Sequence, residues 1–288
     1  MDFSGIWIPL VTPLRDGAVD IPALRRLVQH LADQGVAGFV ACGSTGEAAL
    51  LNDDEQDRVL RTTVEASSGL PVLFGLSGSR TPQLAERARH LAQTGLPAGF
   101  LVSAPVYVRP SQPGIVDHFT AIADATPLPV VAYDVPARTG VRIEIRTLLE
   151  LAAHERIVAV KDCSGDRAAA EALLADGRLA LLAGNDDELF DQLARGATGA
   201  ITASAHLATA RFVALAAALR SGELAAARTL WRALAPLTRA AFAEPNPAPL
   251  KAALACQGWM DDELRPPMQP ASEATAAALL RAAEFSRR

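Results

Sequence analysis

The sequence predicts an α/β protein built as a (β/α)8 TIM barrel with a C-terminal helical appendage. Short, continuously apolar runs recur along the chain, and a segment of helical periodicity follows each of them. Such runs are typical of a parallel sheet that helices cover on both faces. Eight strand–helix units within about 220 residues match a closed barrel. An open doubly wound sheet usually has a glycine-rich fingerprint after its first strand, but Thr12-Pro13-Leu14-Arg15 stands there instead.

Eight apolar runs are the predicted strands. They are Ile6–Val11, Gly38–Cys42, Pro71–Gly75, Gly99–Ser103, Pro129–Tyr133, Ile157–Lys161, Leu179–Ala183 and Gly199–Thr202.

Local signals predict where several intervening helices begin and end. Asp20 is placed to cap the first helix, and Gly35 to end it. Asn52, followed three residues later by Glu55, has the spacing of a capping box. Thr81 before a proline marks another helix start.

After the eighth unit the chain becomes rich in alanine with helical periodicity. We expect helices at about 207–220, 223–243, 247–257 and 271–285. No linker or internal repeat interrupts the chain, so the predicted organisation is a catalytic barrel over residues 1–220 with a C-terminal helical segment, 221–288, packed on it.

Composition excludes several classes of partner. The chain has 27 basic and 32 acidic residues, and its arginines are scattered, which argues against nucleic acid. No uncharged stretch approaches the roughly 20 residues that span a membrane. Met1–Pro13 lacks the basic start of a signal peptide. We therefore expect a cytoplasmic protein that binds neither nucleic acid nor membrane.

Cysteine spacing predicts neither disulfides nor a metal site. Cys42, Cys163 and Cys256 lie far apart, without a Cys-x-x-Cys pair and without a histidine at ligand spacing. Buried free thiols in a reducing compartment are the expected state.

Lysine and tyrosine are rare, and their positions single out one end of the barrel. Only two of the 27 basic residues are lysines, Lys161 and Lys251, and the only tyrosines are Tyr107 and Tyr133. Where arginine replaces lysine so widely, a remaining lysine is a candidate for chemistry that needs loss of the proton. Both tyrosines and Lys161 lie at or just beyond predicted strand ends, which form the functional face of such a barrel.

These side chains suit Schiff-base chemistry. Lys161 closes an apolar run, so desolvation is expected to lower its pKa and favour the neutral amine, which can attack a ketone. Tyr133 is a candidate proton shuttle, and the hydroxyls of Ser44 and Tyr107 are candidates for a relay to solvent. Taken alone, Lys161 could instead extend from a strand end to solvent.

Two further features suit carboxylate binding. Gly43, Thr45 and Gly46 leave backbone amides accessible and predict an anion-binding nest. Arg138 can bind a carboxylate through two parallel hydrogen bonds, although a surface ion pair is an equally good interpretation of its position. The segment 244–247 reads first as a break between two helices.

Several motifs, in order and at barrel-consistent spacing, resemble one family. They are Gly43-Ser44-Thr45-Gly46-Glu47, Tyr107-Val108-Arg109-Pro110-Ser111-Gln112, Tyr133-Asp134-Val135-Pro136-Ala137-Arg138-Thr139-Gly140, Val160-Lys161-Asp162 and Glu244-Pro245-Asn246-Pro247. From about residue 3 to about residue 270, the chain resembles the pyruvate-dependent, class I Schiff-base lyases of the dihydrodipicolinate synthase and N-acetylneuraminate lyase family.

The resemblance implies a role for each of these residues. Lys161 would form a covalent imine with pyruvate, so no separate cofactor is implied, and Tyr133 would be the acid–base residue. Ser44, where the synthases usually have threonine, and Tyr107 of a neighbouring subunit would complete the relay. Thr45 and the backbone of Ile201 would hold pyruvate. The family also implies a homo-oligomer, a dimer or a tetramer built of dimers.

The resemblance is closest to the synthases. There, an arginine at the position of Arg138 holds the carboxylate of L-aspartate 4-semialdehyde, which pyruvate attacks in lysine and diaminopimelate biosynthesis. Asp134 in place of asparagine, and the run Lys161-Asp162-Cys163-Ser164-Gly165-Asp166, depart from that pattern. The second departure resembles sugar-acid enzymes, so a keto-acid or sugar-acid aldolase or dehydratase is the alternative. A non-catalytic barrel is a remote third reading.

Overall fold

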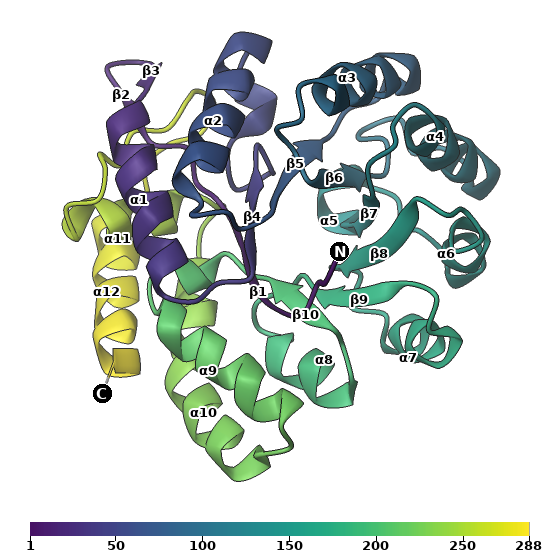
Figure 1. Ribbon diagram of the computed structural model, residues 1–288. Helices are drawn as coiled ribbons and strands as arrows, with labels where there is room; N and C mark the ends of the chain where they lie inside the picture. Colours follow the sequence, from purple (N-terminus) through teal and green to yellow (C-terminus); the bar gives the residue numbers. More distant parts are fainter. Residues whose placement is uncertain (288) are drawn as a thin grey trace.

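The computed structural model describes residues 1–287 and shows eight parallel strands closed into a barrel with helices around it (Figure 1). Neighbouring strands follow chain order, and β1 closes the ring by pairing with both β4 and β10. The strands of the ring are β1 (Gly5–Pro9), β4 (Gly38–Ala41), β5 (Val72–Leu76), β6 (Gly99–Ser103), β7 (Val130–Asp134), β8 (Ile157–Asp162), β9 (Ala180–Ala183) and β10 (Gly199–Ile201). The predicted (β/α)8 fold is confirmed, and each strand ends within two residues of its predicted limits.

Helices occupy most of the segments between strands. The α-helices are α1 (Ile21–Asp33), α2 (Asp53–Ala66), α3 (Thr81–Gln93), α4 (Gln112–Asp124), α5 (Pro136–Thr139), α6 (Ile145–Leu151), α7 (Arg167–Asp176), α8 (Leu189–Arg195), α9 (Thr209–Arg220), α10 (Leu224–Ala241), α11 (Ala248–Cys256) and α12 (Glu273–Arg287). A small hairpin, β2 (Leu14–Arg15) and β3 (Ala18–Val19), precedes α1, and two 3-10 turns, η1 (Ala48–Leu50) and η2 (Ser204–His206), follow β4 and β10.

The predicted helix signals are realised in the structure. The Asp20 side chain accepts from the amide of Ala23 at 2.9 Å, which caps α1. Asn52 and Glu55 form the reciprocal bonds of a capping box at the start of α2. Each bond satisfies an amide that has no partner within the helix.

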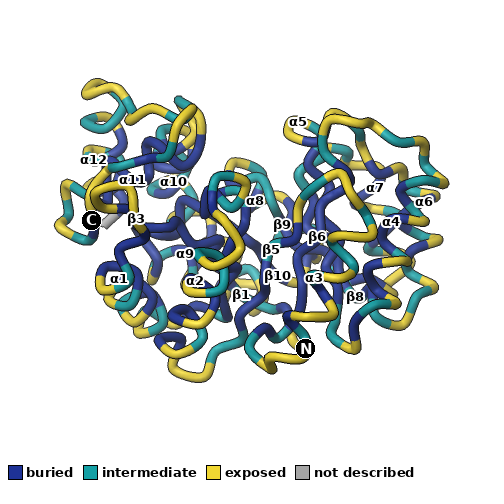
Figure 2. Tube along the Cα trace, turned by 90° about the horizontal axis from the view of Figure 1, so that it is seen from above, coloured by how far each residue is buried: buried dark blue, intermediate teal, exposed yellow. Residues whose placement is uncertain are grey.

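Apolar side chains form two layers of core. The inner layer fills the barrel itself and includes Trp7, Val40, Leu101, Val131 and Leu182. The outer layer lies between strands and helices (Figure 2). Because successive strand residues face opposite sides, every fully covered strand supplies both layers, which explains why the runs are apolar without alternation.

The C-terminal helices extend the barrel on one side. α10 packs against α9 and α12, and α11 packs against α12. The ring of Trp259, just after α11, stacks on that of His30 on α1. Figure 2 shows α11 and α12, like α5, on the side of the barrel away from the N-terminus. The division at residue 220 stays a prediction.

Two sequence-based expectations concern the chain as a whole. All three cysteines are free, but Cys256 is exposed at the end of α11, so the expectation of buried thiols is wrong for it. Among the helices of residues 1–287, none is long and apolar enough to cross a bilayer.

A buried carboxyl fixes the segment that follows β7. Asp134 ends β7 and is almost fully buried, and its Oδ1 accepts from the amide of Ile143 at 3.1 Å. This bond joins the residues before and after α5, the short helix that carries Arg138. Burial, with the nearby charge of Asp162, raises the pKa of Asp134 to about 7, despite the opposing hydrogen bond from Ile143.

Replacing this carboxyl should make the protein more stable at neutral pH. Because the pKa of Asp134 is higher in the folded chain, folding stability falls as pH rises from about 4 to about 7. Asp134→Asn keeps an oxygen for Ile143 but cannot ionise, so we expect a gain on the order of 2–4 kcal/mol in unfolding free energy at pH 8 and little change at pH 4. Urea unfolding at both values measures it, with exposed Asp117→Asn as the control. A gain that is equal at both pH values would contradict this assignment.

Candidate active site

The register of two neighbouring strands places Tyr133 directly beside Lys161. Tyr133 on β7 pairs with Lys161 on β8, near the carboxyl ends of both strands. The Lys161 Nζ lies 4.4 Å from the centre of the Tyr133 ring. Lys161 is 5% exposed and Tyr133 8%. The two residues singled out by their rarity therefore meet at the functional end of the barrel, as the sequence predicts.

Burial and neighbouring groups shift the proton equilibria of this pair. Burial raises the pKa of Tyr133, although Lys161 and a hydrogen bond with Ser44 oppose the shift. Burial also disfavours the Lys161 ammonium, but the acidic groups of Tyr133, Cys163 and Asp186 favour it more, so the pKa of Lys161 lies above its ordinary value. The expectation of a lowered lysine pKa is therefore wrong. The resting side chains are an ammonium and a neutral phenol.

Cys163 and Gly184 pack around the lysine. Burial raises the pKa of Cys163 to about 12, so its sulfur is a thiol. A Cβ on Gly184 would lie 2.4 Å from the Cys163 Sγ and 3.0 Å from the Lys161 Cγ. Only glycine lets the end of β9 approach so closely, which fixes the stem of the lysine.

Asp186 is a second buried carboxyl near the lysine. Its oxygens accept from the amides of Ser204, at 2.6 Å, and Ala203, at 3.3 Å. Burial raises the pKa of Asp186, and the charge of Lys161 opposes that shift. Asp186 therefore joins the segment after β9 to η2, and its carboxyl interacts electrostatically with Lys161.

The turn after β4 brings Ser44 and Thr45 to the same site. Gly43 and Thr45 are buried, Ser44 is half-buried, and Ser44 shares a hydrogen bond with Tyr133. The amide of Gly46 donates to the Gly43 carbonyl at 3.0 Å. The expected anion nest is therefore wrong for Gly46, because that amide already closes the turn. The Ser44 and Thr45 amides take no part in this bond.

Asn246 connects the turn to Arg138. Its Nδ2 donates to Thr45 Oγ1 at 2.9 Å, and its backbone carbonyl accepts from the Arg138 guanidinium at 3.4 Å. The sequence predicts a break between two helices in this segment but not the contact of Asn246 with Thr45. Asn246 lies 201 positions from Thr45 and 108 from Arg138, and only the family motif marked its position.

A cavity of about 320 Å³ opens above Tyr133. Its polar lining includes Ser44, Glu47, Ser77, Ser103, Arg138, Thr139 and Asn246. The apolar part of the wall is formed by Leu50, Val106, Val135, Pro267 and Met268, among others. Within residues 1–287, Arg138 is the only basic side chain that lines this cavity, so an anionic group has one evident partner there.

Two predicted site residues, Ile201 and Tyr107, lie outside the lining of the cavity. Ile201 ends β10 and belongs to the same inner core cluster as Tyr133, but it does not line the cavity. Tyr107 does not line the cavity: its side chain is 91% exposed, and its backbone has a φ of +70°. The hydroxyl relay is therefore incomplete within one chain.

Among the described residues, no group of three His, Cys, Asp or Glu side chains converges as a metal site. Tyr133, Ser44 and Arg138 bring a phenol, a hydroxyl and a guanidinium to the cavity, and the Lys161 amine lies beside the Tyr133 ring. An amine beside a proton-transferring phenol can form an imine with a ketone.

Comparison with known proteins agrees with this chemistry. The model of the dihydrodipicolinate synthetase family matches residues 2–285. A curated relative from Pelobacter propionicus, named 4-hydroxy-tetrahydrodipicolinate synthase, is 39% identical over 280 residues, which cover 96% of each chain. Further curated relatives at 35–38% identity bear the same name.

Solved structures show the same likeness. A dihydrodipicolinate synthase from Thermotoga maritima is 33% identical, with a TM-score of 0.96 over 100% of this chain and 99% of its own. The enzyme from Acinetobacter baumannii, solved with pyruvate, is 32% identical, with a TM-score of 0.95 over 99% of both chains. With a family model, curated relatives and solved structures all matching over nearly its whole length, this chain belongs to the dihydrodipicolinate synthetase family.

Proposed function

We propose that this chain is a Schiff-base lyase that condenses pyruvate with L-aspartate 4-semialdehyde, as a 4-hydroxy-tetrahydrodipicolinate synthase does. The observation that supports this most is the buried pair of Lys161 and Tyr133 under a cavity whose one lining cation is Arg138. The amine would take the ketone, and the guanidinium the carboxylate of the second substrate.

Pyruvate binds first in this proposal. Its carboxylate lies against the Ser44 and Thr45 amides and the Thr45 hydroxyl, near Gly43 and the backbone of Ile201. This directs the ketone carbon to Lys161. The lysine must lose its ammonium proton before its Nζ attacks, because only the free amine has an electron pair to donate. No further cofactor takes part.

Tyr133 moves the protons that follow. Its neutral phenol protonates the carbinolamine oxygen, which leaves as water and gives the iminium on Lys161. The phenolate then regains a proton through Ser44. Loss of a proton from the methyl carbon to solvent converts the iminium to an enamine, the carbon nucleophile that attacks the aldehyde.

The cavity wall favours aspartate semialdehyde over the alternative sugar acids. A polyhydroxylated acid would bring several hydroxyls against Leu50, Val106, Val135 and Met268. Each hydroxyl held against these apolar side chains, rather than against the polar lining, would lack a hydrogen-bond partner, at a cost of about 1–3 kcal/mol. A panel of aspartate semialdehyde, neutral aldoses, glyoxylate and hexarate-derived acids, each with pyruvate, separates the synthase from the aldolase or dehydratase.

We also propose a homo-oligomer in which a neighbouring chain supplies Tyr107. The tyrosine projects from a loop whose residues Tyr107 and Arg109 have positive φ, and Val108 between them is also exposed. Exposed apolar side chains on a strained loop suit an interface between chains.

The free thiols of Cys42 and Cys163 suit the reducing cytoplasm.

Borohydride with pyruvate should label Lys161 covalently, since reduction traps the imine. Lys251 should remain unlabelled, because it is fully buried in an ion pair. Labelling should be faster at pH 8.5 than at pH 6.5, because the raised pKa of Lys161 leaves only a small fraction of free amine, and that fraction grows with pH. Peptide mass mapping locates the label. Unlabelled Lys161 in active protein would rule out the imine mechanism.

Arg138→Lys should impair the second half of the reaction selectively. Lysine keeps the charge but loses the bidentate geometry, so we expect kcat/KM for aspartate semialdehyde to fall on the order of 100-fold. Imine trapping with pyruvate should be unchanged. Exposed Arg146→Lys on α6 is the matched control. Undiminished turnover in the Arg138 variant would remove this residue from the site.

Mixing two inactive variants should restore activity if Tyr107 acts across an interface. Tyr107→Phe lacks the relay phenol and Lys161→Ala lacks the amine, but a mixed dimer contains one complete site. After joint unfolding and refolding of equal amounts, random pairing should give roughly a quarter of the wild-type activity. Native mass spectrometry verifies the mixed species. Mixed dimers without activity would show that Tyr107 does not act in trans.

A further inference from the structure

The second lysine of the chain lies outside the reaction centre and is fully buried. Lys251 is on α11 with 0% of its surface exposed. Its Nζ donates to Glu47 Oε1 at 2.7 Å and to the Thr12 carbonyl at 2.9 Å. Burial lowers the pKa of Lys251, and the Glu47 carboxylate opposes that shift. A buried ammonium is retained only where such partners replace water.

Glu47 is the last residue of the turn that holds Ser44 and Thr45. It is buried with a φ of +56°, a left-handed conformation that is uncommon for a residue with a side chain. Its amide donates to the Ser44 carbonyl at 3.2 Å. The geometry of Glu47 is therefore coupled directly to the residue that contacts Tyr133.

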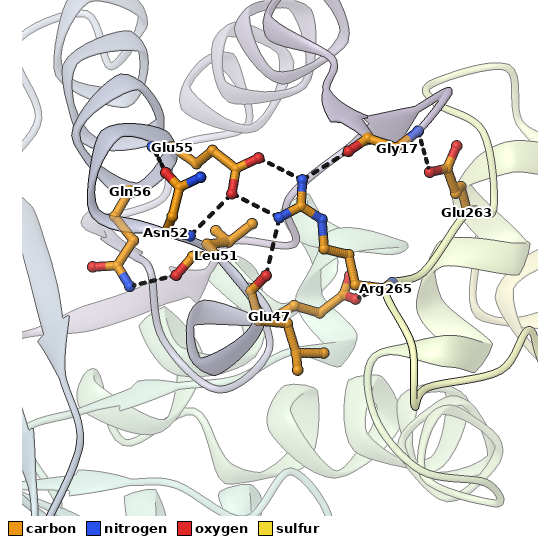
Figure 3. Close-up of polar contacts among 9 residues, drawn as sticks. Gly17, Glu47, Leu51, Asn52, Glu55, Gln56, Glu263 and Arg265 are labelled. Atoms are coloured by element: carbon orange, nitrogen blue, oxygen red, sulfur yellow. Dashed lines mark hydrogen bonds and ion pairs between the residues drawn. The ribbon is translucent and has the colours of Figure 1, made fainter.

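Arg265, from the loop before α12, holds the other oxygen of Glu47. The Arg265 amide donates to Glu47 Oε2 at 3.0 Å. Its guanidinium binds Glu55 and the carbonyls of Leu50 and Gly17 (Figure 3). Both carboxylate oxygens of Glu47 are thus held from the C-terminal segment, one by a side-chain cation and one by a backbone amide.

The same contacts join the turn to the end of β1. The Thr12 hydroxyl donates to the Gly46 carbonyl at 2.7 Å, while the Thr12 carbonyl accepts from Lys251. A Cβ on Gly46 would lie 2.9 Å from the Leu10 carbonyl, so the turn fits only as glycine. Thr12, the turn and α11 therefore form one closely packed unit.

We propose that Lys251 is a positioning residue for pyruvate: its ion pair with Glu47 fixes the 43–47 turn against β1 and so places Ser44 and Thr45. Together with the Asn246–Thr45 bond, it anchors the turn at two points from the same C-terminal segment. This inference rests on the proposed function, in which that turn receives the pyruvate carboxylate.

The composition of the chain supports a specific need for lysine here. Of 27 basic residues, 25 are arginines, yet this position keeps a lysine. Lys251 is surrounded on its own helix by buried residues, among them Leu250, Ala252 and Leu254. A compact ammonium fits such a slot, whereas the broader planar guanidinium would displace its neighbours.

Three variants test the proposal, each compared with wild type for pyruvate KM, kcat, rate of borohydride-trappable imine formation and thermal unfolding. Lys251→Met keeps the length but leaves Glu47 as an unpaired buried charge. We expect a rise of about tenfold or more in pyruvate KM and equally slower trapping, with kcat at saturating pyruvate changed less than about threefold. Glu47→Gln should act in the same direction. The double variant should recover part of the loss, because it leaves no unpaired charge.

Arg15→Ala is the matched control. Its exposed ion pair with Asp261 also joins the β2–β3 hairpin to the C-terminal segment but does not contact the turn. Pyruvate KM and trapping should equal wild type in this variant. If Lys251→Met does not fold, Glu47→Gln and the double variant provide the same comparison.

The outcomes separate this inference from the function on which it rests. A lower melting temperature with unchanged pyruvate KM and trapping, in the variants that fold, would show that the pair only stabilises the fold and would overturn the positioning role. If wild-type protein traps no pyruvate at all, the proposed function itself fails. A change in kcat alone, with normal pyruvate KM and trapping, would likewise contradict the proposal.

Discussion

The register between β7 and β8 is the constraint on which the site depends. In a parallel pair, one residue of slip would turn a side chain from the barrel interior toward the surrounding helices. The observed pairing sets Tyr133 opposite Lys161, and puts Asp134 and Asp162 on the other face. One face of the β7–β8 pair thus carries the Lys161 amine and the Tyr133 phenol. On the other face, the Asp134 carboxyl binds the amide of Ile143, which follows α5 in the chain. Closure of the barrel keeps that register, because each strand is held on both sides.

The fold and the central pair of the site were predictable because they are encoded locally. Apolar runs, capping residues and the scarcity of lysine and tyrosine are visible without knowledge of distant contacts. Features that depend on distant contacts were not predictable in this way. The pKa of Lys161 follows from groups on three separate segments, including Asp186. The contacts of Asn246 and Lys251 join residues 201 and 204 positions apart. The sequence nevertheless marked Lys251 as unusual, because it is one of only two lysines in the chain.

The C-terminal helices are part of the site rather than an addition to it. Asn246 contacts Thr45, and Pro247, Pro267 and Met268 line the cavity beside barrel residues. A barrel ending after its eighth strand–helix unit would lack one wall of that cavity. The segment therefore has two effects that composition alone would not separate: it covers apolar surface on the outside of the barrel, and it shapes the volume above Tyr133.

Burial of both lysines also determines the chemical character of the surface. With Lys161 and Lys251 inside, the folded chain presents no lysine amine to solvent, and its external positive charge comes from guanidinium groups. Guanidinium keeps its proton to above about pH 12, so this charge is constant over the range in which a lysine-rich surface would begin to neutralise. Acylating and glycating reagents, which need a free amine, find no lysine target there. Arginine usage thus leaves the exterior without lysine amines that could form imines with carbonyl compounds and confines lysine–carbonyl chemistry to one enclosed position.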